Sequence, residues 1–309
     1  MSQDLTLDQT LSVAFANNMR LRPQQLQSRL VPTVLSDLGF MDPGDTFTSE
    51  FQGTSEPTER TGRAPKSPEG WVEEERRIAA FAAFDDGKFI DTVDKANKLA
   101  DPTNGTMRAM IAGKERARDR MILRSMLAPA RQGRTGETSV PFPASQVIAV
   151  NNKVFYRGKA DEVAAPGASN TVLTPAKLRA AAELLDESEM PGERYIAVCS
   201  EDLQNMLTSV ETTSEDFAGV KALVNGTLDQ FLGFKFVRLQ KSMFTVPTAN
   251  VRDLVAWVKD AVEYKSRDLE EAKVEKRADR SYTPYAYYLF RHACLRAFDT
   301  GVVNIKVAF

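Results

Sequence analysis

The amino-acid sequence predicts an α+β protein, and three features lead to this fold class. Of its 309 residues, 42% are apolar and 27% are charged, as in soluble globular proteins, so most of the chain should fold. Residues 104–128 form one long stretch of helical periodicity. Short apolar runs that are typical of strands follow it as far as residue 307. The length suits one large core or two modest domains.

The N-terminal region predicts two short helical pieces in residues 4–30, on either side of Pro23. Between residues 42 and 71 the composition changes, because four prolines and four glycines accompany only three large apolar residues. These three are Phe47, Phe51 and Trp71, and we expect no core to form there. Residues 47–51 and 78–84 predict the arms of a long hairpin with this stretch as its tip. Such a loop is uncommon unless a function or a neighbouring subunit orders it.

The helix predicted at 104–128 stops at Pro129, which cannot continue it. About 25 residues at 1.5 Å each would span roughly 37 Å, so we interpret it as a structural spine. The remaining elements come from shorter patterns. Thr174 is a helix N-cap with a proline after it, a second helix begins at Ser200, and a third is expected at 217–224. Strands are expected at residues 139–150, 153–156, 195–198, 231–239, 255–258, 272–276 and 302–307.

No residue pattern indicates a catalytic, cofactor or metal site. The single histidine, His292, excludes HExxH zinc sites and histidine-rich metal clusters, and the apolar run before it favours a structural role. The sequence has no Gly-x-Ser-x-Gly motif, and Gly113-Lys114 lacks the earlier glycine of a phosphate loop. The run 73–77, three glutamates and two arginines, is typical of a solvated surface. We therefore expect no catalytic residue, no cofactor and no metal.

Charge and cysteine content narrow the class of protein further. Forty basic and forty-two acidic residues give a net charge of -2, which argues against a protein whose main task is to neutralise phosphates. The mixed-sign run at 114–120 favours salt bridges on a helix over nucleic-acid binding. Cys199 and Cys294 match neither a CxxC pair nor a disulfide framework, which indicates a reducing compartment. We find no export signal and no apolar stretch of about 18 residues, and so expect no membrane contact.

Residues 192–237 resemble the A-domain of tailed-phage major capsid proteins with the Hong Kong 97-type fold. The order of the elements around them agrees, and the motifs at 231–234 (Phe-Leu-Gly-Phe) and 277–282 are similar to those of short-tailed phages. The resemblance implies an N-terminal arm, an E-loop hairpin, a P-domain with the spine helix, an A-domain and closing P-domain strands. The corresponding residues are 1–41, 42–88, 89–172, 173–267 and 268–309.

The resemblance implies a major capsid protein that self-assembles into hexamers and pentamers of an icosahedral head, located in the virion. The head would enclose double-stranded DNA without sequence-specific binding, which agrees with the near-neutral charge. About forty residues precede the hairpin, too few for a fused scaffold, so the implied partners are a separate scaffolding protein and a portal protein. A decoration protein is a further candidate. Assembly would take place in the bacterial host cytoplasm.

Two alternatives stay open from the sequence. One is an encapsulin-type nanocompartment shell, which resembles the same fold, and the other is a soluble enzyme with an unrecognised site. Some capsid proteins also crosslink their hairpin through a lysine, and Lys66 is the only lysine between 42 and 71. We interpret Lys66 as a solvated loop residue.

Three local expectations can be compared with the structure. Trp71, Phe81 and Phe84 should be protected at the base of the hairpin. His292 and Cys294 should pack on a closing strand or helix near the spine. Deleting residues 45–70 and joining Gly44 to Gly70 should cost the isolated fold little, because loop length has a small effect on stability.

Overall fold

The computed structural model describes residues 24–36, 44–63, 67, 70–90, 102–151, 170–211 and 230–309. The chain divides into two compact units. The first consists of residues 1–28, 82–117 and 267–291, and the second consists of residues 29–81, 118–266 and 292–309. None of the described helices is both long and apolar enough to cross a membrane.

The core of the second unit is a six-stranded sheet in the order β7-β14-β11-β8-β10-β9. Its strands are β7 (Val147–Ile148), β14 (Val302–Ala308), β11 (Val251–Val258), β8 (Arg194–Val198), β10 (Phe234–Arg238) and β9 (Gln230–Phe231). The central strand β11 runs antiparallel to both β14 and β8, and all of its residues are buried. A strand covered on both faces is expected to be almost continuously apolar, as the sequence predicted for 255–258.

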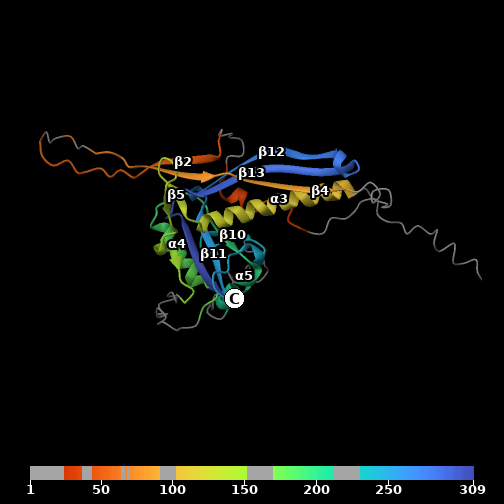
Figure 1. Ribbon diagram of the computed structural model, residues 1–309. Coiled ribbons are helices and arrows are strands. Elements are labelled where there is room, and N and C mark those ends of the chain that lie inside the picture. Colours follow the sequence, from red (N-terminus) through yellow and green to blue (C-terminus); the bar gives the residue numbers. More distant parts are fainter. Residues whose placement is uncertain are drawn as a thin grey trace, which may run out of the picture. The chain divides into compact units, whose positions relative to one another are not determined.

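Two helices lie beside this sheet, α4 (Pro175–Asp186) and α5 (Ser200–Glu211) (Figure 1). The predicted cap of α4 is confirmed, because the Thr174 side chain accepts a hydrogen bond from the Lys177 amide at 3.4 Å. Leu178 and Leu185 of α4 and Met206 of α5 are buried in the same core as the sheet. Short 3-10 helices cover Val31–Thr33, Ala144–Gln146, Lys241–Met243, Lys259–Ala261 and Ala278–Arg280.

A smaller sheet in the second unit contains the predicted hairpin. Its order is β2-β3-β5-β6, formed by β2 (Thr46–Gln52), β3 (Glu74–Ala80), β5 (Ala130–Gln132) and β6 (Thr138–Val140). The first predicted arm is confirmed, whereas the second arm is Glu74–Ala80, so only residues 78–80 of the predicted 78–84 belong to it. A separate strand, β4 (Ala82–Phe89), follows and belongs to another sheet.

That sheet has the order β1-β12-β13-β4, formed by β4, β1 (Leu35–Ser36), β12 (Val262–Arg277) and β13 (Thr283–Arg296). The long helix α3 (Pro102–Leu127) confirms the predicted spine and ends before Pro129. In the first unit, Ala286, Tyr288 and Phe290 alternate along β13 and pack with Met110 of α3. The alternation of strand residues therefore gives β13 one face that the helix covers.

Several of the predicted elements differ from the structure. The strand expected at 139–150 is instead the short strands β6 and β7 with a 3-10 turn between them, because Pro141 and Pro143 lack the amide that a sheet needs. The helical piece expected after Pro23 is irregular at residues 24–30. The predictions for residues 4–23, 153–156 and 217–224 lie outside the described residues.

The irregular backbone at 28–30 has a specific cause, which is that acidic side chains of α3 bind its amides. Asp119 accepts from the amides of Arg29 and Leu30, each at 3.1 Å, and Glu115 accepts from the Ser28 amide at 3.2 Å. In a helix that began at residue 24, these amides would instead donate to carbonyls four residues earlier. The acids of the run at 114–120 thus bind backbone, a role that the sequence did not predict.

The strand expected at 231–239 is a tight hairpin of β9 and β10. Leu232 and Gly233 form its turn with φ values of 48° and 80°. Positive φ at both central positions is the geometry that a two-residue hairpin requires. The Phe-Leu-Gly-Phe motif therefore encodes a turn.

Candidate assembly interface

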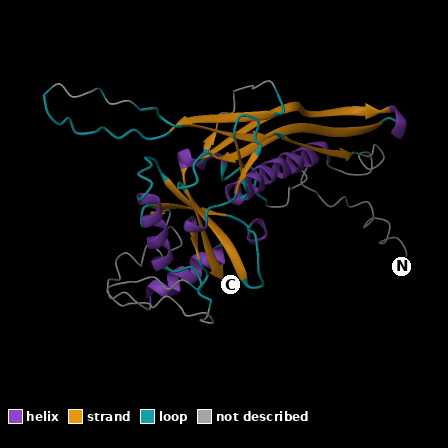
Figure 2. Cartoon of the chain, turned by 60° about the vertical axis from the view of Figure 1, so that its left-hand side comes forward, coloured by secondary structure: helices purple, strands orange, loops and turns teal. Residues whose placement is uncertain are grey.

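The hairpin of β2 and β3 is regular at its base and has exposed side chains beyond it. The two strands pair antiparallel from Thr46 opposite Ala80 to Gln52 opposite Glu74, and the Gly53 amide donates to the Glu73 carbonyl at 2.7 Å. All side chains described between residues 53 and 63 are exposed. Figure 2 shows this part of the loop extending beyond the ends of the strands.

The base of the hairpin belongs to an apolar cluster, which corrects one expectation. Phe47 is 1% exposed and packs with Leu295 and Ala297, and the ring of Phe51 lies 4.6 Å from that of Phe298. The segment 42–71 therefore does contribute core residues. Deleting 45–70 would remove Phe47 together with β2, so the small cost expected for this deletion rests on a premise that the structure contradicts.

The aromatic residues expected at the base differ in their surroundings. Phe81 packs against the Phe47 cluster, as predicted, with ring centroids 5.7 Å apart. Trp71 is 100% exposed and Phe84 is 40% exposed, so their expected protection is wrong for the single chain. Trp71 lies beyond the last pair of β2 and β3, which is Gln52 opposite Glu74.

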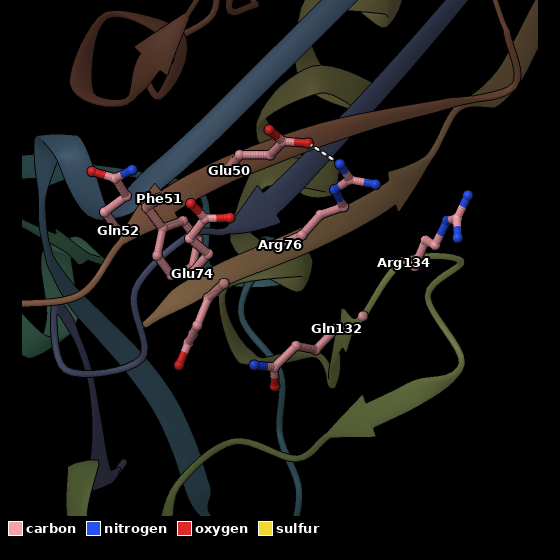
Figure 3. A pocket seen from close by; sticks show the side chains of 9 residues that line it. Glu50, Phe51, Gln52, Glu74, Arg76, Gln132 and Arg134 are labelled. Atoms are coloured by element: carbon pink, nitrogen blue, oxygen red, sulfur yellow. Dashed lines mark ion pairs between the residues drawn. The ribbon is translucent and has the colours of Figure 1, made fainter. Parts of the chain in front are cut away.

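A cavity of about 730 Å³ opens where the hairpin meets the turn between β5 and β6. Figure 3 shows its walls, formed by Glu50, Phe51, Gln52, Glu74, Glu75, Arg76, Gln132, Gly133 and Arg134. Glu50 and Arg76 form an ion pair across the two hairpin strands. Three carboxylates, two guanidinium groups and two amides give the cavity a polar wall that suits hydrated protein contacts. Among the described residues no group of three or more His, Cys, Asp or Glu could hold a metal ion.

The run 73–77 is only partly the solvated surface that the sequence predicted. Arg76 has 40% of its side chain exposed, whereas Arg77 is 5% exposed as a whole residue. Neighbouring residues of a strand point to opposite faces, and Arg77 lies opposite the buried Ser49. The Ser49 hydroxyl in turn donates to Glu263 at 2.5 Å. Sequence reasoning missed Arg77, because only the register with β2 reveals its inward direction.

His292 and Cys294 lie on β13 with 0% and 7% exposure, which confirms that they are packed. The Tyr264 hydroxyl is 3.3 Å from His292 Nδ1. Burial, together with the nearby charge of Arg118, lowers the pKa of His292 to about 4, so the imidazole is neutral at neutral pH. Burial also raises the pKa of Cys294, and Ser125 of α3 bonds to this thiol. Both cysteines of the chain are free.

Two further sequence predictions concern lysines. The sequence argued against a phosphate loop at Gly113-Lys114, and the structure places this pair within the helix α3. Lys66 lies outside the described residues.

The described chain thus combines a hairpin with an exposed loop, one long helix and a six-stranded sheet. The family model described as phage capsid protein matches residues 7–308, and the chain belongs to that family. A search of the curated proteins finds no match.

Solved structures of phage capsids share the fold. The capsid of Ralstonia phage GP4 is 9% identical with a TM-score of 0.69, over 97% of this chain and 95% of that chain. A chain of the cyanophage P-SCSP1u capsid is 16% identical with a TM-score of 0.66, over 97% and 93%. A chain of Mycobacterium phage Che8 is 15% identical with a TM-score of 0.61, over 96% and 97%. The predicted Hong Kong 97-type fold is confirmed.

The chain is a major capsid protein whose copies form the icosahedral head shell of a tailed phage. Its place is the capsid of the virion. The family match favours this function over the encapsulin-type shell and over a soluble enzyme.

Proposed function

We propose that the hairpin of one copy lies across a neighbouring copy and that this contact joins subunits into hexamers and pentamers. One observation carries the proposal, namely a hairpin whose base is packed and whose described loop is wholly exposed, including Trp71 at 100%. A fully exposed tryptophan gains nothing for the isolated fold. Tryptophan is also among the residues that contribute most to protein interfaces.

The ordering of such a loop is costly for a single chain, because each residue fixed loses about 1–2 kcal/mol of backbone entropy. A contact with a second copy offsets that loss at each position in the shell. The five segments that the resemblance implied, from the N-terminal arm to the closing strands, are part of this proposal.

The proposal includes the partners and the surroundings of the shell. A separate scaffolding protein directs assembly in the host cytoplasm, a portal protein occupies one vertex, and double-stranded DNA fills the head without sequence-specific contacts. The net charge of -2 supports the last point, because a wall that does not attract DNA lets it pack and leave. The protein acts without a catalytic residue, cofactor or metal.

Limited proteolysis tests the hairpin contact. The free subunit should be cut between Gly53 and Gly62, since exposed polar loops are preferred cleavage sites, and the assembled shell should be spared. Mass spectrometry of the fragments locates the cuts. Equal cleavage of free and assembled protein would contradict the intersubunit role.

A further inference from the structure

Three charged residues, two of them buried arginines, meet where the hairpin joins the core of the second unit. They are Arg77 of β3, Arg296 at the end of β13, and Asp299 in the turn that follows. We propose that this cluster fixes the direction in which the hairpin leaves the subunit, and so the geometry at which one copy reaches the next. The inference rests on the proposed role of the hairpin.

A single carboxylate holds both arginines. Arg77 donates from Nη1 to Asp299 Oδ1 at 2.8 Å and from Nη2 to Oδ2 at 2.7 Å, and Arg296 Nε donates to Oδ1 at 2.6 Å. Arg77 and Arg296 are 5% and 1% exposed. Although burial acts to raise it, the hydrogen bonds from both arginines hold the pKa of Asp299 below its ordinary value. The carboxylate therefore stays charged at neutral pH.

The two arginines also bond to the backbone of neighbouring elements. Arg77 Nη1 donates to the Arg296 carbonyl at 2.9 Å. Arg296 Nη1 donates to the carbonyls of Met126 and Ala128, at 2.8 and 3.0 Å, where α3 ends and its last carbonyls need donors. The Arg296 guanidinium lies 4.9 Å from the ring of Phe142. The cluster thus joins the hairpin strand to β13 and to the C-terminal end of the long helix.

Directional bonds explain why this cluster orients the hairpin when the apolar contacts cannot. Burial of Phe47 and Phe51 is favourable in any arrangement that removes them from water, so these contacts tolerate sliding. The paired bonds of Arg77 to one carboxylate require a planar fork and specify one orientation. A seven-residue strand is about 23 Å long, so a rotation of about 10° at its base moves the far end by about 4 Å.

Stability alone does not account for the cluster. Apolar residues of the same volume often stabilise a fold as well as a buried ion pair does, because desolvation offsets the attraction. Directional hydrogen bonds between charged groups instead favour a single geometry. A subunit that must repeat the same contact around a closed shell needs that property.

The substitution Arg77→Lys tests the proposal, because it keeps the charge and the stem and removes the planar fork. The matched control is Arg76→Lys on the same strand, whose ion pair with Glu50 is exposed. We expect both variants to keep the thermal melt of the unchanged chain. Arg77→Lys should exchange the amide hydrogens of β2 and β3 at least tenfold faster and should give shells of mixed size or capsomers alone. Arg76→Lys should match the unchanged chain in both measurements.

Hydrogen exchange of the free subunit and sedimentation velocity of the assembly products decide the outcome. Shells of unchanged size from Arg77→Lys, with unchanged exchange, would overturn the inference. If Arg77→Lys does not fold, Asp299→Glu moves the carboxylate by one methylene at constant charge, and the same two results are expected of it. Deletion of residues 54–69, which keeps both hairpin strands, separates the two proposals. If the deletion variant forms shells, the proposed function is wrong, whereas normal shells from Arg77→Lys alone contradict only the cluster's role.

Discussion

At the scale of single residues, two buried charged side chains of this protein bond to backbone groups. Asp119, with 0% exposure, accepts from two amides of the N-terminal segment. Lys177, also fully buried, donates to the carbonyls of Val150, Thr171 and Lys306 at 3.0, 3.0 and 2.8 Å. Three carbonyls match the three donors of an ammonium group. Such residues hold in place irregular segments, which lack the regular hydrogen-bond ladder of paired strands.

Substitution of Lys177 by methionine should therefore destabilise the fold. The side chains are similar in volume, but three carbonyls lose a donor, and we expect a loss of about 2 kcal/mol. Urea unfolding followed by circular dichroism measures it. Arg179→Met, on the exposed side of α4, is the control and should change stability little. An unchanged midpoint for Lys177→Met would contradict the role of the buried ammonium.

His292 should make stability depend on pH in a defined direction. Its pKa is about 4 in the folded protein and near 6.5 in the unfolded chain, so the unfolded chain binds the additional proton between these values. Stability present above pH 6.5 is lost as the pH falls towards 4, by about 2 kcal/mol between pH 7 and pH 5.

The variant His292→Gln should remove this part of the pH dependence and leave assembly yield nearly unchanged. Urea unfolding at pH 7 and pH 5 measures the free energy of unfolding of both proteins. All other titratable groups are the same in the two proteins, so the difference in their pH dependence is due to His292. Equal pH dependence in the two proteins would show that the imidazole is not held neutral. Loss of a catalytic activity in His292→Gln, with an intact fold, would instead support the enzyme alternative.

At the scale of elements, the turn between β9 and β10 carries local strain. Leu232 has a φ of 48°, a region in which a side chain with a Cβ is disfavoured, and its side chain is 45% exposed. Asparagine tolerates this conformation and precedes glycine in the most favourable hairpin turns.

Replacing Leu232 by asparagine should accordingly stabilise the subunit by about 1 kcal/mol. The control Leu232→Ile should do the opposite, because β-branched residues avoid positive φ. Thermal melts test both expectations, which are a higher melting temperature for Leu232→Asn and a lower one for Leu232→Ile. A lower melting temperature for Leu232→Asn would mean that the leucine side chain contributes more through packing than its conformation costs.

At the scale of the whole molecule, the hairpin serves assembly through its loop and the fold through its base. Phe47 and the pairing of β2 with β3 belong to the fold, as the apolar cluster with Leu295 shows. The exposed residues beyond Gly53 do not contribute to that cluster. A deletion that separates the two roles must therefore keep both strands.

Deleting residues 54–69 and joining Gly53 to Gly70 should give a soluble subunit with a cooperative melt. Loop length affects stability by only about 0.6 kcal/mol per doubling, so the core should survive. Assembly should stop at monomers or capsomers, because the contact is lost in every copy. Sedimentation velocity measures assembly, and a circular dichroism melt measures stability. As a control, replacing the loop by Gly/Ser residues of equal length keeps the distance that the loop can span and changes only its side chains. Full-size shells from the deletion would refute the hairpin's role, and loss of the melt would place the loop in the core.

Local signals in the sequence were sufficient for most of the elements. Proline at 129 ends the long helix, and Thr174 caps α4 through its own hydroxyl. Each depends on residues within a few positions of one another, so the chain carries the whole signal. The order of these elements along the chain also led to the correct family.

Only the tertiary structure decided which side chains of those elements are buried and what they bind. The sequence by itself predicted a hairpin and its first arm, but the register of β2 on β3 places Arg77 inward, next to Asp299, which is more than two hundred positions further along the chain. The same holds for residues 28–30, whose helical pattern gives way because carboxylates of α3 bind their amides. The physical reason is that a charged side chain has the same local pattern whether it faces water or a distant partner. Its burial depends on the partner that folding brings to it.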